Sequence, residues 1–131
     1  MVNDMSKAIH DVRSARLAGV VADHGWDALV LYGNAWQCDY LRYATDYVCI
    51  EGNAIAVAMK DGGRRLFVES PLEAGRAETE CPWLDVSWSP DAVSAAAAFL
   101  DGLGNCKLAS APATLMPYGL IRGRRDEEME D

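Results

Sequence analysis

The chain has 131 residues, half of them apolar, and its 20 acidic and 12 basic residues give a net charge of −8. This length suits one domain that buries roughly two thirds of the surface exposed by the unfolded chain. The negative charge opposes binding to nucleic acids and to anionic membrane surfaces, so we expect the protein to bind neither of them. No apolar run approaches the ~20 residues of a membrane span, and we expect a cytoplasmic protein.

The chain begins with a predicted amphipathic helix. Apolar residues recur near helical spacing from Asp4 to about Asp23, and Gly25 supplies the residue that commonly ends a helix. The apolar run from Asp27 to Tyr32 then predicts a strand that is buried on both faces of a sheet.

A loop with several chemically useful side chains follows this strand. Gly33 and Asn34 interrupt the extended pattern, and an aromatic residue then recurs at i, i+4 and i+7. This spacing predicts a short helix over residues 36–44 with one aromatic face, formed by Trp36, Tyr40 and Tyr43.

The middle of the chain reads as strands joined by a tight turn. The sequence predicts strands at Tyr47–Ile50 and Ala54–Lys60, and the Asp-Gly-Gly stretch at 61–63 predicts a hairpin turn into a strand at Arg64–Glu69.

The second half alternates between helix and strand. Ser70 to Glu73 has the pattern of a capping box with proline at the first helical position. The predicted elements are a helix from Pro71 to about Glu80, a strand at Leu84–Trp88, a helix from Ser89-Pro90-Asp91 to Gly102 or Gly104, a strand at Cys106–Ser110, and a turn with a final helix within 112–131.

This order of elements predicts an α/β fold with one mixed sheet flanked by helices. We interpret residues 1–131 as a single domain. The charged segment 121–131 reads as the start of a linker helix.

Few residues offer catalytic chemistry. His10 and His24 lie fourteen residues apart on one predicted helix, about 21 Å, so they cannot share a metal ion and are expected at the surface or at a helix end. The four cysteines form no CxxC pair and are expected to be reduced, mostly buried thiols: Cys38, Cys49, Cys81 and Cys106. We therefore expect no catalytic residue and no metal site in this chain.

Four segments in order carry a resemblance to a known family. They are RLAGVVADHGWDALVLYGN (16–34), DYLRY (39–43), AIAVAMKDGGRRLFV (54–68) and SPLEAGR (70–76). Their order and spacing resemble the N-terminal domain of the creatinase, prolidase (Xaa-Pro dipeptidase) and aminopeptidase P family over about residues 4–120.

The resemblance implies a three-layer, ribonuclease-H-like domain without catalytic metal ligands. In that family, two aspartates, a histidine and two glutamates belong to a C-terminal pita-bread domain, and two divalent metal ions are expected only in a peptidase-type catalytic domain. The implied partners are such a domain and a second subunit of a homodimer.

The resemblance also implies a use for the loop after the first strand. In several family members, this region of one subunit reaches the active-site mouth of its neighbour, which makes Trp36, Tyr40 and Arg42 candidates for substrate contact in trans. This chain has YLRY at 40–43 where many members have tyrosine, leucine, a small polar residue and glycine, so peptide, creatine-like and other amide substrates stay open. In the alternative interpretation, Tyr40 and Leu41 belong to the core.

Three functions follow from these observations. The first is a non-catalytic accessory domain of a metal-dependent Xaa-Pro peptidase or creatinase-like amidohydrolase, supporting dimerisation and shaping the substrate entrance. The second is a free-standing module that binds a small ligand or protein through the loop at 36–43. The third, a nuclease, is opposed by the net charge.

Overall fold

The computed structural model describes residues 4–104, 107–111 and 125–128 of the chain. Its helices and strands follow the predicted alternation closely. In order they are α1 (Asp4–Asp23), β1 (Ala28–Asn34), α2 (Asp39–Thr45), β2 (Asn53–Met59), β3 (Arg64–Val68), α3 (Pro71–Glu80), β4 (Asp85–Trp88), α4 (Ala92–Gly102), β5 (Leu108–Ala111) and β6 (Arg125–Glu128).

The strands form one mixed sheet in the order β4-β3-β2-β1-β5-β6. Strand β2 pairs antiparallel with both β1 and β3, while β1 with β5, β3 with β4 and β5 with β6 are parallel pairs. Val30 opposite Val57 sets the central register. The residues of β1 from Ala28 to Gly33 are buried, as expected for a strand covered on both faces.

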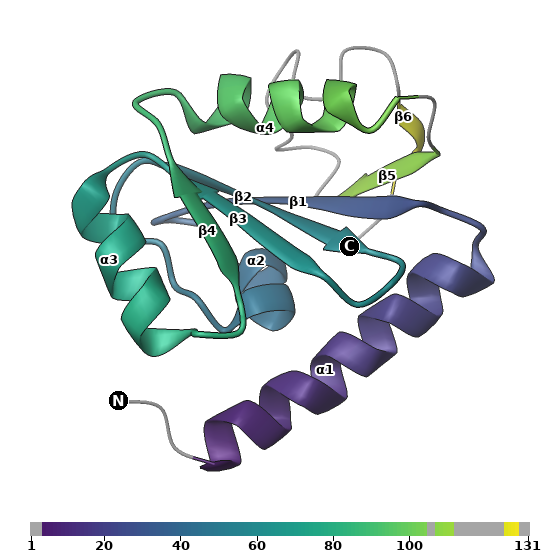
Figure 1. Ribbon diagram of the computed structural model, residues 1–131, viewed down its shortest axis with the longest axis horizontal. Helices are drawn as coiled ribbons and strands as arrows, with labels where there is room; N and C mark the ends of the chain where they lie inside the picture. The colour runs from purple at the N-terminus through teal and green to yellow at the C-terminus, as the bar shows by residue number, and fades with distance from the viewer. Residues whose placement is uncertain (1–3, 105–106, 112–124, 129–131) are drawn as a thin grey trace.

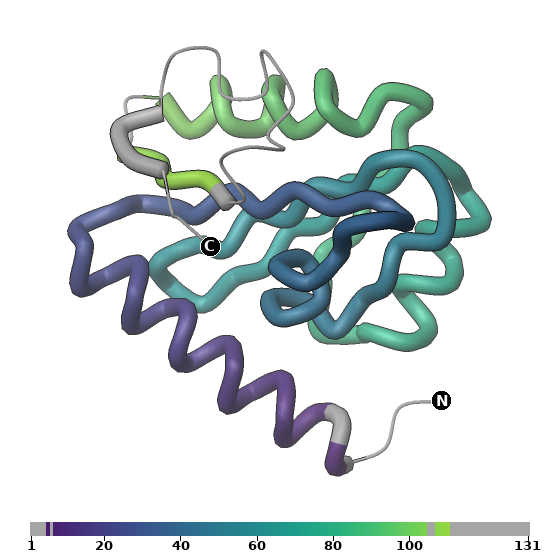
Figure 2. The backbone as a smooth tube through the Cα atoms, turned by 180° about the vertical axis from the view of Figure 1, so that it is seen from behind, coloured from purple at the N-terminus to yellow at the C-terminus, as the bar shows by residue number. Residues whose placement is uncertain are grey.

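The sheet is the middle of three layers (Figure 1). Helix α4 lies over one face, and α1, α2 and α3 lie over the other. Seen from behind, α1 and α2 are on the same side of the sheet as each other (Figure 2). The predicted mixed α/β sheet with flanking helices is therefore confirmed. Within the described residues, no helix is long and apolar enough to cross a membrane.

Local signals set the helix ends. Gly25 takes the left-handed conformation after α1, with φ of 72°. The Ser70 hydroxyl accepts a hydrogen bond from the Glu73 backbone N–H at 3.1 Å and caps α3. Asp91 caps α4 in the same way through the N–H of Ser94 at 3.1 Å.

The predicted strand at Tyr47–Ile50 is wrong, because its backbone groups bond to side chains. The Tyr47 N–H donates to Thr45 Oγ1 at 3.0 Å. The Ile50 N–H donates to the Glu73 carboxylate at 3.3 Å. These hydrogen bonds take the place of the backbone pairing with a neighbouring strand that a β-strand would need. The segment is therefore an irregular loop.

The predicted surface position of His10 is also wrong. Its side chain is 4% exposed and stacks on Trp83, with ring centroids 4.6 Å apart. The Trp83 indole donates from Nε1 to the Thr45 carbonyl at 3.0 Å, so this ring pair joins α1 to the far end of α2. His24 is exposed, as expected, and stacks on Trp26.

The expected final helix is corrected where the structure describes it. Residues Arg125–Glu128 form β6 beside β5, so backbone pairing overrides the helical interpretation of this charged stretch. The rest of the predicted linker, 121–124 and 129–131, lies outside the described residues, as does Cys106 in the predicted strand at 106–110.

Candidate functional site

Asn34, the last residue of β1, organises the loop that leads to α2. Its Oδ1 accepts hydrogen bonds from the backbone N–H groups of Trp36 and Gln37, each at 2.9 Å. Below the loop, a Cβ on Gly33 would stand 3.0 Å from the Leu41 Cβ. Only glycine fits there without a shift, so the loop packs closely on α2.

The structure separates the three residues that we expected to contact substrate. Trp36 lies outside the helix, which begins at Asp39 instead of residue 36, and its side chain is 93% exposed. Arg42 is exposed and forms no ion pair within the described part of the chain. Tyr40 is partly buried and faces a groove that neither Trp36 nor Arg42 lines. Leu41 is fully buried, in keeping with the packing interpretation of that residue.

A buried carboxylate supports the neighbouring loop at 47–52. The Glu73 side chain accepts hydrogen bonds from the Tyr47 hydroxyl and the Ile50 N–H, and it pairs with Arg76 at 2.9 Å. Burial raises the pKa of Glu73, but the hydrogen bonds from Tyr47, Arg76 and Ile50 outweigh burial and hold the pKa below its usual value. Arg76 also donates to the Val48 carbonyl.

The sequence predicted that Glu73 belongs to a capping box, and its carboxylate has other partners in the structure. A capping box predicts that its carboxylate returns to the start of its own helix, and Ser70 does make its half of that pattern. The carboxylate instead turns inward to Tyr47, a residue 26 positions away. No spacing rule identifies such a partner.

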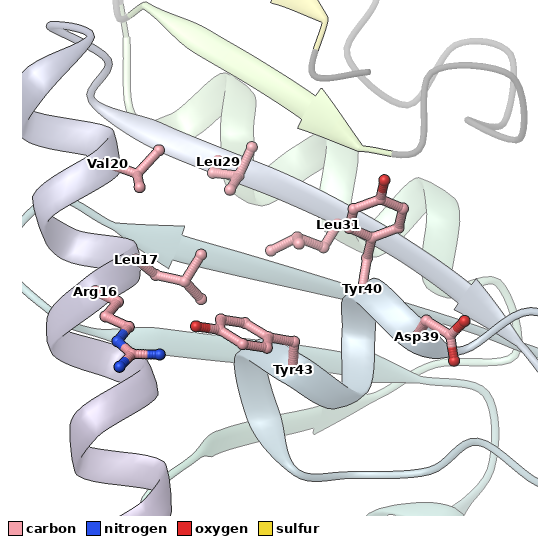
Figure 3. Close-up of a pocket in the computed structure, with 8 residues that line it drawn as sticks. All are labelled: Arg16, Leu17, Val20, Leu29, Leu31, Asp39, Tyr40 and Tyr43. Atoms are coloured by element: carbon pink, nitrogen blue, oxygen red, sulfur yellow. The ribbon is translucent and has the colours of Figure 1, made fainter. Parts of the chain in front are cut away.

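The groove lies between α1 and α2 above β1 (Figure 3), and we call it the α1–α2 groove. Its volume is about 420 Å³. Each helix contributes residues at i, i+1 and i+4, which share one helix face, and β1 contributes two residues two positions apart. The lining residues are Arg16, Leu17, Val20, Leu29, Leu31, Asp39, Tyr40 and Tyr43.

Within the described residues, no group of three or more His, Cys, Asp or Glu side chains is placed to hold a metal ion. Cys38, Cys49 and Cys81 are free thiols. Burial raises the pKa of Cys49 to about 11 and that of Cys81 to about 12, which disfavours the nucleophilic thiolate.

Comparison with known proteins identifies the architecture. No protein-family model and no curated protein matches the chain. Among solved structures, the N-terminal, creatinase/prolidase-like domain of a Corynebacterium diphtheriae protein assigned as a metallopeptidase is similar over 91% of this chain and 94% of that one, with a TM-score of 0.67 and 16% identity. This chain has the fold of a creatinase/prolidase-like N-terminal domain.

Two further structures show how this creatinase/prolidase-like fold occurs elsewhere. An aminopeptidase P structure from Streptococcus thermophilus matches over 93% of this chain and 91% of its own, with a TM-score of 0.68 and 16% identity. The Xaa-Pro dipeptidase from Bacillus anthracis matches over 93% of this chain with the same TM-score and identity, but this chain covers only 33% of it. In that dipeptidase, the fold is one part of a larger polypeptide.

Proposed function

We propose that this chain is a non-catalytic accessory domain of a metal-dependent Xaa-Pro peptidase or creatinase-like amidohydrolase. The observation that carries the proposal is the fold, which matches a prolidase from Pyrococcus horikoshii over 90% of this chain but only 32% of that one. The sparse chemistry of the described residues supports the same role, because catalysis would then belong to another domain.

In this proposal, the partners are a C-terminal pita-bread catalytic domain and a second subunit of a homodimer in the cytoplasm. Two divalent metal ions would be held by a peptidase-type catalytic domain. The domain described here would support dimerisation and shape the substrate entrance of that domain.

The loop between β1 and α2 is the surface that we assign to the substrate entrance. Trp36 projects from a loop whose backbone is fixed by Asn34, so an exposed aromatic ring is presented with little freedom in its backbone. Arg42 offers a guanidinium without an ion-pair partner in the described residues, and guanidinium groups bind carboxylates in bidentate fashion. Tyr40 lines the separate α1–α2 groove.

A hydrolysis assay tests the proposal that this chain has no catalytic activity of its own. The purified chain is incubated with Xaa-Pro dipeptides or creatine, each with added Mn²⁺, Co²⁺ or Zn²⁺. We expect no turnover above the buffer and metal control. Turnover that disappears when a residue within 1–131 is substituted would contradict the accessory role.

One observation favours a second candidate function, a free-standing module that binds a small ligand. The α1–α2 groove is of ligand size and lies within this chain alone. Loop and groove are separate surfaces, so substitutions at Trp36 and in the groove distinguish the two functions.

A further inference from the structure

Two cysteines from separate loops meet at the start of α2. Cys38 immediately precedes α2, and Cys49 lies in the irregular loop at 47–52. The Cys49 backbone N–H donates to Cys38 Sγ at 3.3 Å, and the same sulfur lies 3.9 Å from the Tyr47 carbonyl oxygen. The sulfur of one cysteine therefore contacts the backbone of the other.

This contact brings the two residues within reach of a disulfide bond. Because an N–Cα bond is ~1.5 Å long, the Cys49 Cα lies within ~5 Å of Cys38 Sγ. Disulfides join residues whose Cα atoms are ~4.4–6.8 Å apart. The Cys49 thiol is directed at the carbonyls of Glu51 and Gly52, at 3.2 and 3.6 Å, so bond formation requires this side chain to rotate toward Cys38.

Cys38 is the thiol that a small oxidant reaches first. It is half-buried, whereas Cys49 is only 3% exposed. Burial raises the pKa of the Cys38 thiol, while the hydrogen bond from the Cys49 N–H and the Arg42 charge act against that increase. Both of these groups stabilise a Cys38 thiolate, which is the form that attacks an oxidant.

We propose that Cys38 and Cys49 are a reversible redox pair, which a low-molecular-weight disulfide such as oxidised glutathione converts into an intramolecular disulfide. The Cys38 thiolate attacks one sulfur of oxidised glutathione, forms a mixed disulfide and releases one glutathione thiolate. The Cys49 thiolate then attacks Cys38 Sγ, forms the protein disulfide and releases the second glutathione. The two thiol protons pass to the released glutathione thiolates, so one disulfide is reduced for each one formed.

The bond changes the surface that carries Trp36. It joins the loop at 34–38 to the loop at 47–52, and both loops present apolar side chains, with Trp36 93% and Ile50 62% exposed. In the reduced chain the Cys49 thiol bonds to carbonyls of its own loop, and in the oxidised chain it gives up these contacts. The redox pair itself does not depend on the proposed accessory role.

Peptide mapping of the wild-type chain tests the proposal. The fully reduced chain is incubated with oxidised glutathione at alkaline pH, because burial keeps both thiols protonated at neutral pH, and is then alkylated. Trypsin cleaves after Arg42 and so separates the two cysteines. Without reductant, we expect peptide 17–42 to be linked to peptide 43–60, and dithiothreitol should release both.

The other two cysteines serve as internal controls. Cys81 and Cys106 share the tryptic peptide 77–107, which should carry two alkylated thiols with or without oxidised glutathione. Cys38→Ser and Cys49→Ser should each abolish the linked peptides, whereas the matched variant Cys81→Ser should retain them.

Amide NMR measures the effect on the surface. Between the reduced and oxidised forms of the ¹⁵N-labelled chain, the largest shift changes should fall in residues 34–38 and 47–52. Changes in α4, which packs on the opposite face of the sheet, should be small. Unchanged shifts in the two loops would contradict the claim that the bond alters this surface.

Three results would overturn the redox pair. They are full alkylation of Cys38 and Cys49 after treatment, a lasting glutathione adduct on Cys38 that Cys49 does not resolve, and a linkage that includes peptide 77–107 or a second chain. Because the peptide map of the wild-type chain is decisive, the test does not depend on the folding of any variant. Inactivity toward Xaa-Pro substrates would leave the result unaffected.

Discussion

Replacing Trp36 with alanine tests whether the loop between β1 and α2 is a surface or part of the core. The side chain is 93% exposed, so of the ~250 Å² that a large aromatic residue can bury, the substitution loses less than ~20 Å². At ~25 cal/mol per Å², the free energy of unfolding should fall by ~0.5 kcal/mol or less. The backbone bonds from Trp36 and Gln37 to Asn34 do not involve the indole and should persist.

Trp83→Ala is the matched control. This indole is partly buried, stacks on His10 at 4.6 Å and donates to the Thr45 carbonyl at 3.0 Å, so its removal should cost ~3–5 kcal/mol. Both variants are compared with the wild-type chain by urea denaturation, followed by circular dichroism. A loss above ~2 kcal/mol for Trp36→Ala would place its side chain in the core and refute the assignment.

Three further predictions concern the buried groups. Glu73→Ala should lower the free energy of unfolding, measured by urea denaturation, by ~3–5 kcal/mol, because Arg76 and the Tyr47 hydroxyl lose their acceptor. A loss below ~1 kcal/mol would contradict the hydrogen-bond network around Glu73. Burial, and next the Arg64 charge, lower the pKa of His10 below 6.5, so the folded chain favours the neutral imidazole. The stability that is present above pH 6.5 should therefore be lost as the pH falls from 6.5 toward the pKa of His10 in the folded chain. His10→Phe should reduce that loss, whereas an unchanged pH profile would exclude His10 as its source. Alkylation under denaturing, non-reducing conditions should modify all four cysteines, as counted by intact-mass measurement. Only two modified thiols would reveal a disulfide.

The sequence predicted those elements whose signals are local. Helix α1 and its Gly25 end, the hairpin turn at 61–63, the Ser70 cap and the helix start near Asp91 each depend on neighbouring residues, and the structure contains all of them. The order of these elements was enough to predict the mixed α/β sheet.

The errors lie where distant side chains decide the structure. Tyr47–Ile50 has strand-like composition, but the Glu73 carboxylate and the Thr45 hydroxyl take its backbone N–H groups. His10 has the spacing of a helix-surface residue, but Trp83 covers it. Thr45 is a near neighbour of Tyr47, but Glu73 is 23 positions from Ile50, and Trp83 is far from His10 in the sequence, so no periodicity argument identifies either partner.

The candidate site was predicted in part for the same reason. The break at Gly33 and Asn34 placed Trp36 and Arg42 in a loop and short helix, and both side chains are exposed. The α1–α2 groove was not predicted, because it forms only when α1 and α2 pack beside each other over β1.

In the proposed function, the exposed loop at Trp36 serves a catalytic centre outside this domain. Its most direct test is kcat/KM toward an Xaa-Pro dipeptide or creatine, measured on the polypeptide that joins this chain to a catalytic domain and expressed per folded, metal-loaded molecule. Lys107→Ala, at the opposite end of β1, is the control. We expect Trp36→Ala to lower kcat/KM by about tenfold or more, equivalent to ~1.4 kcal/mol of transition-state binding, and Lys107→Ala to leave it unchanged. An unchanged kcat/KM for Trp36→Ala would contradict it.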